Sequence, residues 1–379
     1  MRRLIACVLM AAMLAPLGGC WNYRGLDEIM IVMGSAIDKE QGSENYRITY
    51  EIIDLNKPVK AQGINTVIVS SEGKTKFEAA RNAKKKVSNK LYFGHTQVFV
   101  ISEEIARNEE IGGIIDFLLR DAETRETACL VVLRGKTARE IFETKSLSNI
   151  AVSNEIHDII SNDQKITSST LRVPIYEIFN TLKSEGKALV LPAFHRVDNN
   201  GETVNEANGI AVFKEEKLAG FLTPEETKYF LIATNKTKGG ILPIASEKSG
   251  HADAALEISK NKTKLSFTAR GDKVKVKIKT ETIVYLGEIL KDINTTDLAK
   301  IAELQDIAEK KLEANIMSVI KKTQSEFGAD IFGFGRMIRK KDFKLWNRLK
   351  DNWDEQFRSL KVEVRSDVKI VNTAYLMKT

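Results

Sequence analysis

The stretch Lys273-Val274-Lys275-Val276-Lys277-Ile278-Lys279 alternates strictly between charged and aliphatic residues. Because successive side chains of a β-strand point to opposite faces, this pattern predicts a strand with its aliphatic side chains in a core and its lysines in water. The preceding Arg270-Gly271-Asp272 is also an adhesion motif in animal proteins, but Gly-Asp between two strands is first of all a turn signal. Residues 264–269 are therefore expected to be the antiparallel partner strand.

Two amphipathic helices are expected to follow this hairpin. Apolar residues at spacings of three and four predict a long helix over about residues 297–326, with its core face formed by Ile301, Leu304, Ala308, Leu312, Ile316 and Val319 or Ile320. After a tight glycine turn at 330–335, a second helix is expected to carry Phe343, Trp346, Leu349, Trp353, Phe357 and Leu360. A final strand runs from residue 362 to 370. Residues 250–379 are thus predicted to form an α+β domain.

Strands alternate with helices in the first half of the chain. Strands are expected at 30–38, 46–55, 65–70, 98–101, 128–133 and 189–194, and helices at 75–91, at 111–119 and over much of 138–182. In the helix at 75–91, Phe77, Ala80, Ala83 and Val87 are expected on one face. This alternation favours a mixed sheet covered by helices, in a domain over residues 20–200.

A small middle domain is expected at residues 205–245. It would contain a hairpin of residues 209–214 and 217–222, followed by a helix at 224–233 with Thr223 and Glu226 as its capping box. The fold class predicted for the whole chain is α+β (mixed α/β) and multi-domain, with mixed sheets packed against helices.

The first 19 residues have the pattern of an export signal. Arg2 and Arg3 precede an apolar run from residue 4 to 17, which would give a helix of only about 21 Å, too short for a hydrocarbon core of ~30 Å. The sequence Leu17-Gly18-Gly19-Cys20 resembles the lipobox of bacterial lipoproteins. That resemblance implies cleavage before Cys20 and acylation of Cys20 with a diacylglyceryl group and an N-acyl chain, such as palmitate. Two acyl chains give a stable membrane anchor. An uncleaved anchor and a signal without lipid are the alternatives.

The composition of the chain is compatible with several classes of protein, but it argues against some of them. The 379 residues include 43% hydrophobic and 29% charged residues with a net charge of +7, values ordinary for a globular protein and too mild to indicate nucleic-acid binding. Of the three cysteines, Cys7 lies in the signal and Cys20 is the predicted lipid site. Cys129 remains alone in an apolar run, so we expect no intramolecular disulfide and a buried, inert thiol there.

Motifs for chemistry are largely missing. The Gly-Lys-Thr tripeptides at 73–75 and 135–137 lack the glycine that a phosphate loop needs five positions earlier, where Ile68 and Leu130 stand. The four histidines do not have the spacing of a zinc site, and no Gly-x-Ser-x-Gly is present. We therefore predict no catalytic, cofactor-binding or metal residue and no cofactor. Glycoside hydrolysis stays open, because its carboxylate pair meets only in the fold.

A basic cluster interleaved with aromatic residues lies near the C-terminus. Its cations are Arg336, Arg339, Lys340, Lys341, Lys344, Arg348 and Lys350. One interpretation is contact with anionic phospholipid headgroups. The interpretation that the spacing favours is core packing of Phe343, Trp346 and Leu349, with the cations as a solvated rim.

Segments spread over the mature chain resemble one family, the GerAC or Ger(x)C lipoproteins, which are C subunits of bacterial spore germinant receptors. The similar segments are Gly19-Cys20-Trp21-Asn22, Leu26-Asp27-Glu28, Val32-Met33-Gly34, Ile37-Asp38, Gly94-His95-Thr96-Gln97, Ile101-Ser102-Glu103-Glu104, Asp116, Arg120, Asp121, Arg125, the hairpin 209–220, residues 324–335, Trp346 and Trp353. Gly25 departs from the pattern, since a glutamate is expected there.

The resemblance implies a non-enzymatic subunit on the outer face of the spore inner membrane. It would be anchored by lipid on Cys20 and would act in nutrient-induced germination through contacts with integral-membrane A and B subunits. Two alternatives are a solute-binding lipoprotein of a transporter, which predicts two similar lobes around a ligand cleft, and a cell-wall hydrolase.

Overall fold

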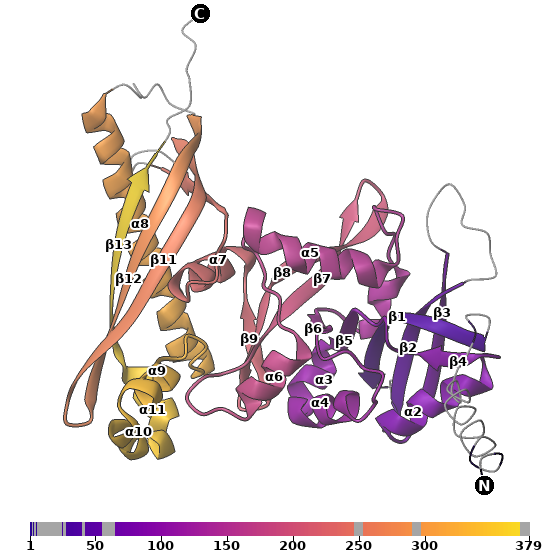
Figure 1. Ribbon diagram of the computed structural model, residues 1–379. Coiled ribbons are helices and arrows are strands. Elements are labelled where there is room, and N and C mark those ends of the chain that lie inside the picture. The colour runs from indigo at the N-terminus through magenta and orange to yellow at the C-terminus, as the bar shows by residue number, and fades with distance from the viewer. Residues whose placement is uncertain are drawn as a thin grey trace, which may run out of the picture.

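The computed structural model describes residues 1, 3, 5, 25, 28–39, 42–54, 65–245, 253–289 and 297–371. Figure 1 shows a larger sheet with its helices in indigo, magenta and pink, and a smaller sheet with its helices mainly in orange and yellow. The predicted fold class, α+β with more than one mixed sheet, is confirmed. None of the described helices combines the length and the apolar character needed to cross a bilayer.

The larger sheet contains nine strands among the described residues. They are β1 (Ile29–Lys39), β2 (Tyr46–Ile53), β3 (Thr66–Gly73), β4 (Lys90–Tyr92), β5 (Val98–Ser102), β6 (Cys129–Leu133), β7 (Val190–Asn199), β8 (Glu202–Lys214) and β9 (Lys217–Leu222). Their order is β3-β2-β1-β5-β6-β7-β8-β9, with β4 paired to the start of β1. The central strands β1, β5, β6 and β7 run parallel. Helices cover such strands on both faces, which explains why β5 and β6 are continuous apolar runs.

The helices around this sheet are α2 (Lys76–Asn82), α3 (Glu103–Asn108), α4 (Ile111–Leu119), α5 (Val152–Ile166) and α6 (Ile175–Leu182), with a 3₁₀ helix at Ala138–Glu143. The prediction of a helix at 111–119 is confirmed. The prediction of one helix over 75–91 is wrong beyond Asn82.

After Asn82 comes a 3₁₀ turn, Ala83–Lys85, and then β4. The Asn82 amide donates to the carbonyl of Glu72, and pairing of β4 with β1 replaces the helical hydrogen bonds of the last turns. Phe77, predicted to face the core, is 60% exposed, while Ala79 and Ala83 are buried.

The predicted hairpin and capping box in the middle of the chain are confirmed. β8 and β9 pair antiparallel, and Thr223 and Glu226 exchange hydrogen bonds at the start of α7 (Pro224–Ala233). This hairpin is not a separate sheet, because β8 also pairs with β7. At Asn200 and Gly201, positive φ values of 55° and 85° fold the chain back on β7. The strands predicted for a middle domain at 205–245 therefore extend the larger sheet.

The smaller sheet has the order β10-β11-β12-β13. Its strands are β10 (Ile241–Ile244), β11 (Ala254–Arg270), β12 (Lys273–Ile289) and β13 (Lys361–Ile370), and β13 lies parallel to β12. The predicted pairing across Gly271-Asp272 is confirmed, with Arg270 opposite Lys273. Val276 and Ile278 are buried, whereas the four lysines between 273 and 279 are exposed.

The predicted long helix is α8 (Leu298–Lys322), whose buried face is the predicted one. The predicted second helix is three shorter ones, α9 (Phe334–Lys341), α10 (Phe343–Leu349) and α11 (Trp353–Ser359). Asp342 interrupts it with φ −144° and ψ 86° and caps α10 by accepting the N–H of Leu345. Within α10, the buried face is formed by Leu345, Trp346 and Leu349, and Phe343, the first residue of the helix, does not belong to it. Trp346 and Leu349 are buried as predicted, but Phe343 is 58% exposed.

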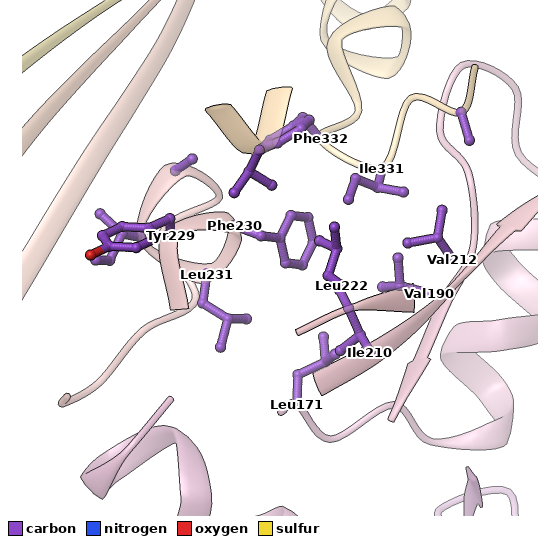
Figure 2. Close-up of a cluster of buried hydrophobic side chains, with 14 of the residues drawn as sticks. Leu171, Val190, Ile210, Val212, Leu222, Tyr229, Phe230, Leu231, Ile331 and Phe332 are labelled. Carbon is purple, nitrogen blue, oxygen red and sulfur yellow. The ribbon is translucent and has the colours of Figure 1, made fainter. Parts of the chain in front are cut away.

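One hydrophobic core joins the two sheets. Figure 2 shows Phe230 of α7 between Phe332, from the turn before α9, and Leu222 of β9. The Phe230 and Phe332 rings lie 5.5 Å apart at 67°, the edge-to-face arrangement that aromatic rings favour. Burying a large apolar side chain contributes ~1.5–3 kcal/mol, so this shared core holds the sheets firmly together.

Candidate interaction surface at the start of strand β1

The predicted lipid site, Cys20, lies outside the described residues. Eight residues lie between it and Ile29, the first residue of β1. The nine Cα-to-Cα steps of an extended chain span at most ~3.6 Å each, or about 30 Å in total. A lipid on Cys20 would keep the start of β1 within that distance of a membrane. We call the surface formed there by residues 84–97 and 116–128 the anchor-proximal end.

The Gly94-His95-Thr96-Gln97 segment lies at this end, between β4 and β5. The buried Thr96 hydroxyl donates to the carbonyl of Val32, 3.2 Å away. The Gln97 N–H donates to Met33, and the Gln97 carbonyl accepts the N–H of Cys129, each at 2.9 Å. Thr96 and Gln97 thus connect β1 to the start of β6. His95 is the side chain of this motif that faces solvent.

The segment rich in arginine and aspartate follows the end of α4. Arg120 pairs with Asp116 at 2.7 Å, and both side chains are largely exposed. Glu123 pairs with Lys90 and accepts the N–H of Phe93 at 3.3 Å. The structure therefore brings residues 90–97 and 116–128 together. Sequence reasoning missed Glu123, since nothing local marks a contact across 30 residues.

Exposed side chains at the anchor-proximal end are mostly charged. Cations come from Lys84, Lys85, Lys86, Arg120 and Arg125, and anions from Asp116, Asp121 and Glu126. Charges of both signs suit ion pairing and hydrogen bonding with a partner surface, and they favour orientation and specificity of binding.

An open cavity of about 550 Å³ lies elsewhere, between α5, β7 and β8. The His195 ring lies 2.6 Å from both Glu206 Oε2 and Asn208 Nδ2, and Asp163 accepts hydrogen bonds from Ser169 and Thr170. These polar groups already bind one another. Within the described ranges, no three His, Cys, Asp or Glu side chains are grouped to hold a metal ion.

Cys129 is fully buried in β6, as predicted. Burial raises the pKa of its thiol to about 11, which keeps the group protonated and unreactive at neutral pH.

Two buried carboxylates, Asp38 and Glu51, hold distant segments against the larger sheet. Asp38 accepts the N–H groups of Ala138 and Arg139 at 2.6 and 2.9 Å, and burial raises its pKa to about 6. Glu51 accepts the N–H of Val152 and, at 2.5 Å, the hydroxyl of Ser153. Asp38 stood out only through the family resemblance, and Glu51 was not identified from sequence.

The turn at 330–335 is the tight connection that its glycines predict. Asp330 is buried and accepts the N–H groups of Gly333 and Gly335 at 2.8 Å each. Gly333 has φ 76°, and a Cβ on Gly335 would lie 2.7 Å from the Trp353 ring. The turn is also connected to the segment that leads into β7 of the larger sheet, because the backbone carbonyl of Asp330 accepts the N–H of Ala188.

These observations define an α+β protein. Its buried polar groups stabilise the fold, and the exposed side chains of its anchor-proximal end are mostly charged. The family model "Spore germination protein N-terminal domain" matches residues 22–196, and "Spore germination B3/GerAC like, C-terminal" matches residues 208–374. The chain belongs to the GerAC-like family of spore germination proteins.

Similar proteins cover nearly its whole length. Spore germination protein KC of Bacillus subtilis (strain 168) is 26% identical over 98% of this chain and 96% of its own. Spore germination protein B3 of the same organism is 27% identical over 96% of each chain. The crystal structure of the GerBC protein shares the fold, with a TM-score of 0.56 and 23% identity over 89% of this chain and 97% of that one.

Proposed function

We propose that this chain is the lipid-anchored, non-enzymatic C subunit of a nutrient germinant receptor. Lipid on Cys20 holds it on the outer face of the spore inner membrane, where it contacts the integral-membrane A and B subunits. The observation that carries this proposal is the position of the anchor-proximal end. Two segments typical of the family, 94–97 and 116–125, meet beside the strand that follows Cys20.

The first experiment tests the anchor with Cys20→Ala, and Cys7→Ala in the leader is the matched control. We expect Cys20→Ala to abolish incorporation of labelled palmitate, to release the protein from spore membranes and to impair nutrient germination. Cys7→Ala should change none of these. Normal germination with an unanchored protein would contradict the proposal.

The second experiment tests the partner surface. Arg125→Glu reverses an exposed charge at the anchor-proximal end, whereas Arg270→Glu reverses one at the tip of the β11–β12 hairpin. We expect only Arg125→Glu to reduce co-purification of the A and B subunits. Equal loss in both variants would argue against this surface.

The two alternatives have less support. A solute-binding lipoprotein would have two similar lobes, but the described sheets have nine and four strands with different orders. For a cell-wall hydrolase, the decisive measurement is clearance of purified peptidoglycan by the mature protein. Such clearance would contradict a non-enzymatic role.

A further inference from the structure

Residues 336–350 hold nearly all of the excess positive charge. Seven lysines and arginines stand there against one acid, Asp342, which gives +6 of the chain's net +7. The other 364 residues are therefore almost neutral. Such a concentration attracts an anionic surface more strongly than the same charge dispersed over the chain.

This segment folds as α9 and α10 at the lower end of the smaller-sheet part in Figure 1. Its inner face packs Ile338, Leu345, Trp346 and Leu349 into the core. Its outer face presents Phe343, 58% exposed, with Lys340, Lys341, Lys344 and Asn347 also exposed. Phe343 lies outside the buried face of α10, so core packing does not account for an aromatic ring at this position.

Some of the cations are already engaged. Arg348 pairs with Asp272 at 2.8 Å, Arg339 lies 3.6 Å from Glu185, and Lys341 donates to the carbonyl of Leu265. Within the part of the chain that the structure describes, Lys340, Lys344 and Lys350 form no ion pair within 4 Å, and Lys350 interacts with Glu185 only over a longer distance. Their charges are available for a partner.

We propose that Phe343, with Lys340, Lys344 and Lys350, forms a second membrane contact that binds anionic phospholipid headgroups. An exposed ring flanked by lysines is the arrangement of interfacial segments, in which the ring enters the headgroup layer and the lysines meet its negative charge. Centres of protein–protein interfaces, in contrast, are depleted in lysine. These observations favour a lipid surface over an acidic protein.

This second contact extends the proposed function, and it rests on that proposal because it assumes the lipid anchor on Cys20. α4, which leads into the anchor-proximal end, and α10 lie along the same lower edge of the molecule in Figure 1. A lipid at Cys20 together with Phe343 would hold the body at two separated points. The tether alone leaves the orientation of the body free, and the second contact sets it.

The test measures maleimide labelling of single cysteines in the full-length protein, purified as the mature lipoprotein and reconstituted into vesicles. The probe is Asn347→Cys on the outer face of α10, and the control is Thr203→Cys in the β7–β8 hairpin on the opposite side of Figure 1. Cys129 gives no background, because it is buried. Vesicles contain either phosphatidylcholine alone or phosphatidylcholine mixed with phosphatidylglycerol.

We expect phosphatidylglycerol to slow labelling at residue 347 several-fold and to leave residue 203 unchanged. Raised salt, Lys340→Gln with Lys344→Gln, or Phe343→Ala should restore the rate, while Lys340→Arg with Lys344→Arg should retain protection. Each lysine should account for about fivefold in membrane occupancy. Equal labelling of residue 347 in both vesicle types would overturn the proposed lipid contact. An acidic protein would then be the better candidate partner for these lysines.

Flotation separates this proposal from the anchor. Protein that floats with neutral vesicles carries a working anchor, whatever happens at residue 347. If the protein floats only with anionic vesicles, and Lys340→Gln with Lys344→Gln abolishes this flotation, the result would support the lipid contact and contradict the anchor. Protein that floats with neither would overturn both.

Discussion

The indole N–H of Trp353 donates a hydrogen bond to the carboxylate of Asp330, with 3.2 Å between Nε1 and Oδ2. The same carboxylate accepts the N–H groups of Gly333 and Gly335. One buried side chain therefore closes the turn before α9 and fixes α11 above it. Since the turn also packs Phe332 against Phe230, Asp330 supports the junction of the two sheets.

Asp330→Asn should destabilise the protein by about 2–4 kcal/mol. The amide NH₂ cannot accept the hydrogen bonds that one carboxylate oxygen accepts now, and each buried donor left without a partner costs about 1–3 kcal/mol. Urea unfolding of the mature protein measures the loss. Asp351→Asn, at an exposed position, is the control and should change stability by less than about 0.5 kcal/mol. Equal stability of the two variants would show that the Asp330 contacts contribute little.

The pKa of Asp38 predicts a pH dependence. Its folded-state pKa of about 6 lies above the unfolded value of 3.8, so the folded protein binds this proton more tightly. The resulting stabilisation is complete below about pH 4 and disappears as the pH rises through 6, a change of about 3 kcal/mol at ~1.4 kcal/mol per tenfold change in proton affinity.

The measurement is the difference in unfolding free energy between the unchanged protein and Asp38→Asn from pH 4 to 7. This difference should fall as the pH rises. Asp367→Asn, exposed on β13, should give a difference that does not vary in this way. A difference for Asp38→Asn that increases with pH would contradict the assigned direction of the pKa.

Gly34 and Gly113 should respond in opposite directions to alanine. A Cβ on Gly34 would lie 2.0 Å from Ser153 Oγ, which donates to the buried Glu51, so Gly34→Ala must displace that network and cost several kcal/mol. Gly113, within α4, has no atom within 4 Å of such a Cβ. Gly113→Ala should stabilise the protein by about 0.4–1 kcal/mol. Thermal unfolding of both variants tests the pair, and a stabilised Gly34→Ala would contradict the packing described.

The exposed face of the smaller sheet contains like charges in opposite positions. Lys264 lies opposite Lys279, which in turn lies opposite Arg365, whereas Lys262 lies opposite Glu281. Directly opposite pairs contribute roughly 0.2–1 kcal/mol, with a sign set by their charges. Lys264→Glu should therefore stabilise the protein at low salt, and Lys262→Glu should destabilise it. High salt should remove both effects, and two shifts of the same sign would refute the cross-strand explanation.

Much of the fold could be predicted where the pattern is local and long. The strand at 273–279, the buried face of α8 and the capping box of α7 are confirmed, because periodicity and a cap depend on residues within a few positions. Predictions were wrong where a distant contact outweighed the local pattern. The helix at 75–91 ended early when β4 paired with β1. Phe343 is exposed at the first position of α10, whose core contacts are made by Leu345, Trp346 and Leu349.

In the candidate site, too, local features could be predicted from the sequence and long-range contacts could not. The family segments could be recognised one by one, but their meeting at the start of β1 depends on Glu123 and on parallel pairing across tens of residues. The predicted lipid site at Cys20 lies outside the described residues and stays a prediction.

By itself, the sequence determined the kind of elements, the family and the place where the chain is expected to meet lipid. Each of these properties depends on short stretches of sequence, through the period of hydrophobic residues, the residues that favour turns, or a sequence motif. Only the tertiary structure decided that the middle hairpin extends the larger sheet, that buried carboxylates such as Asp38 hold distant segments, and that Phe343 lies exposed among unpaired lysines. Those outcomes depend on contacts between residues far apart in the chain, whose energies no local window contains.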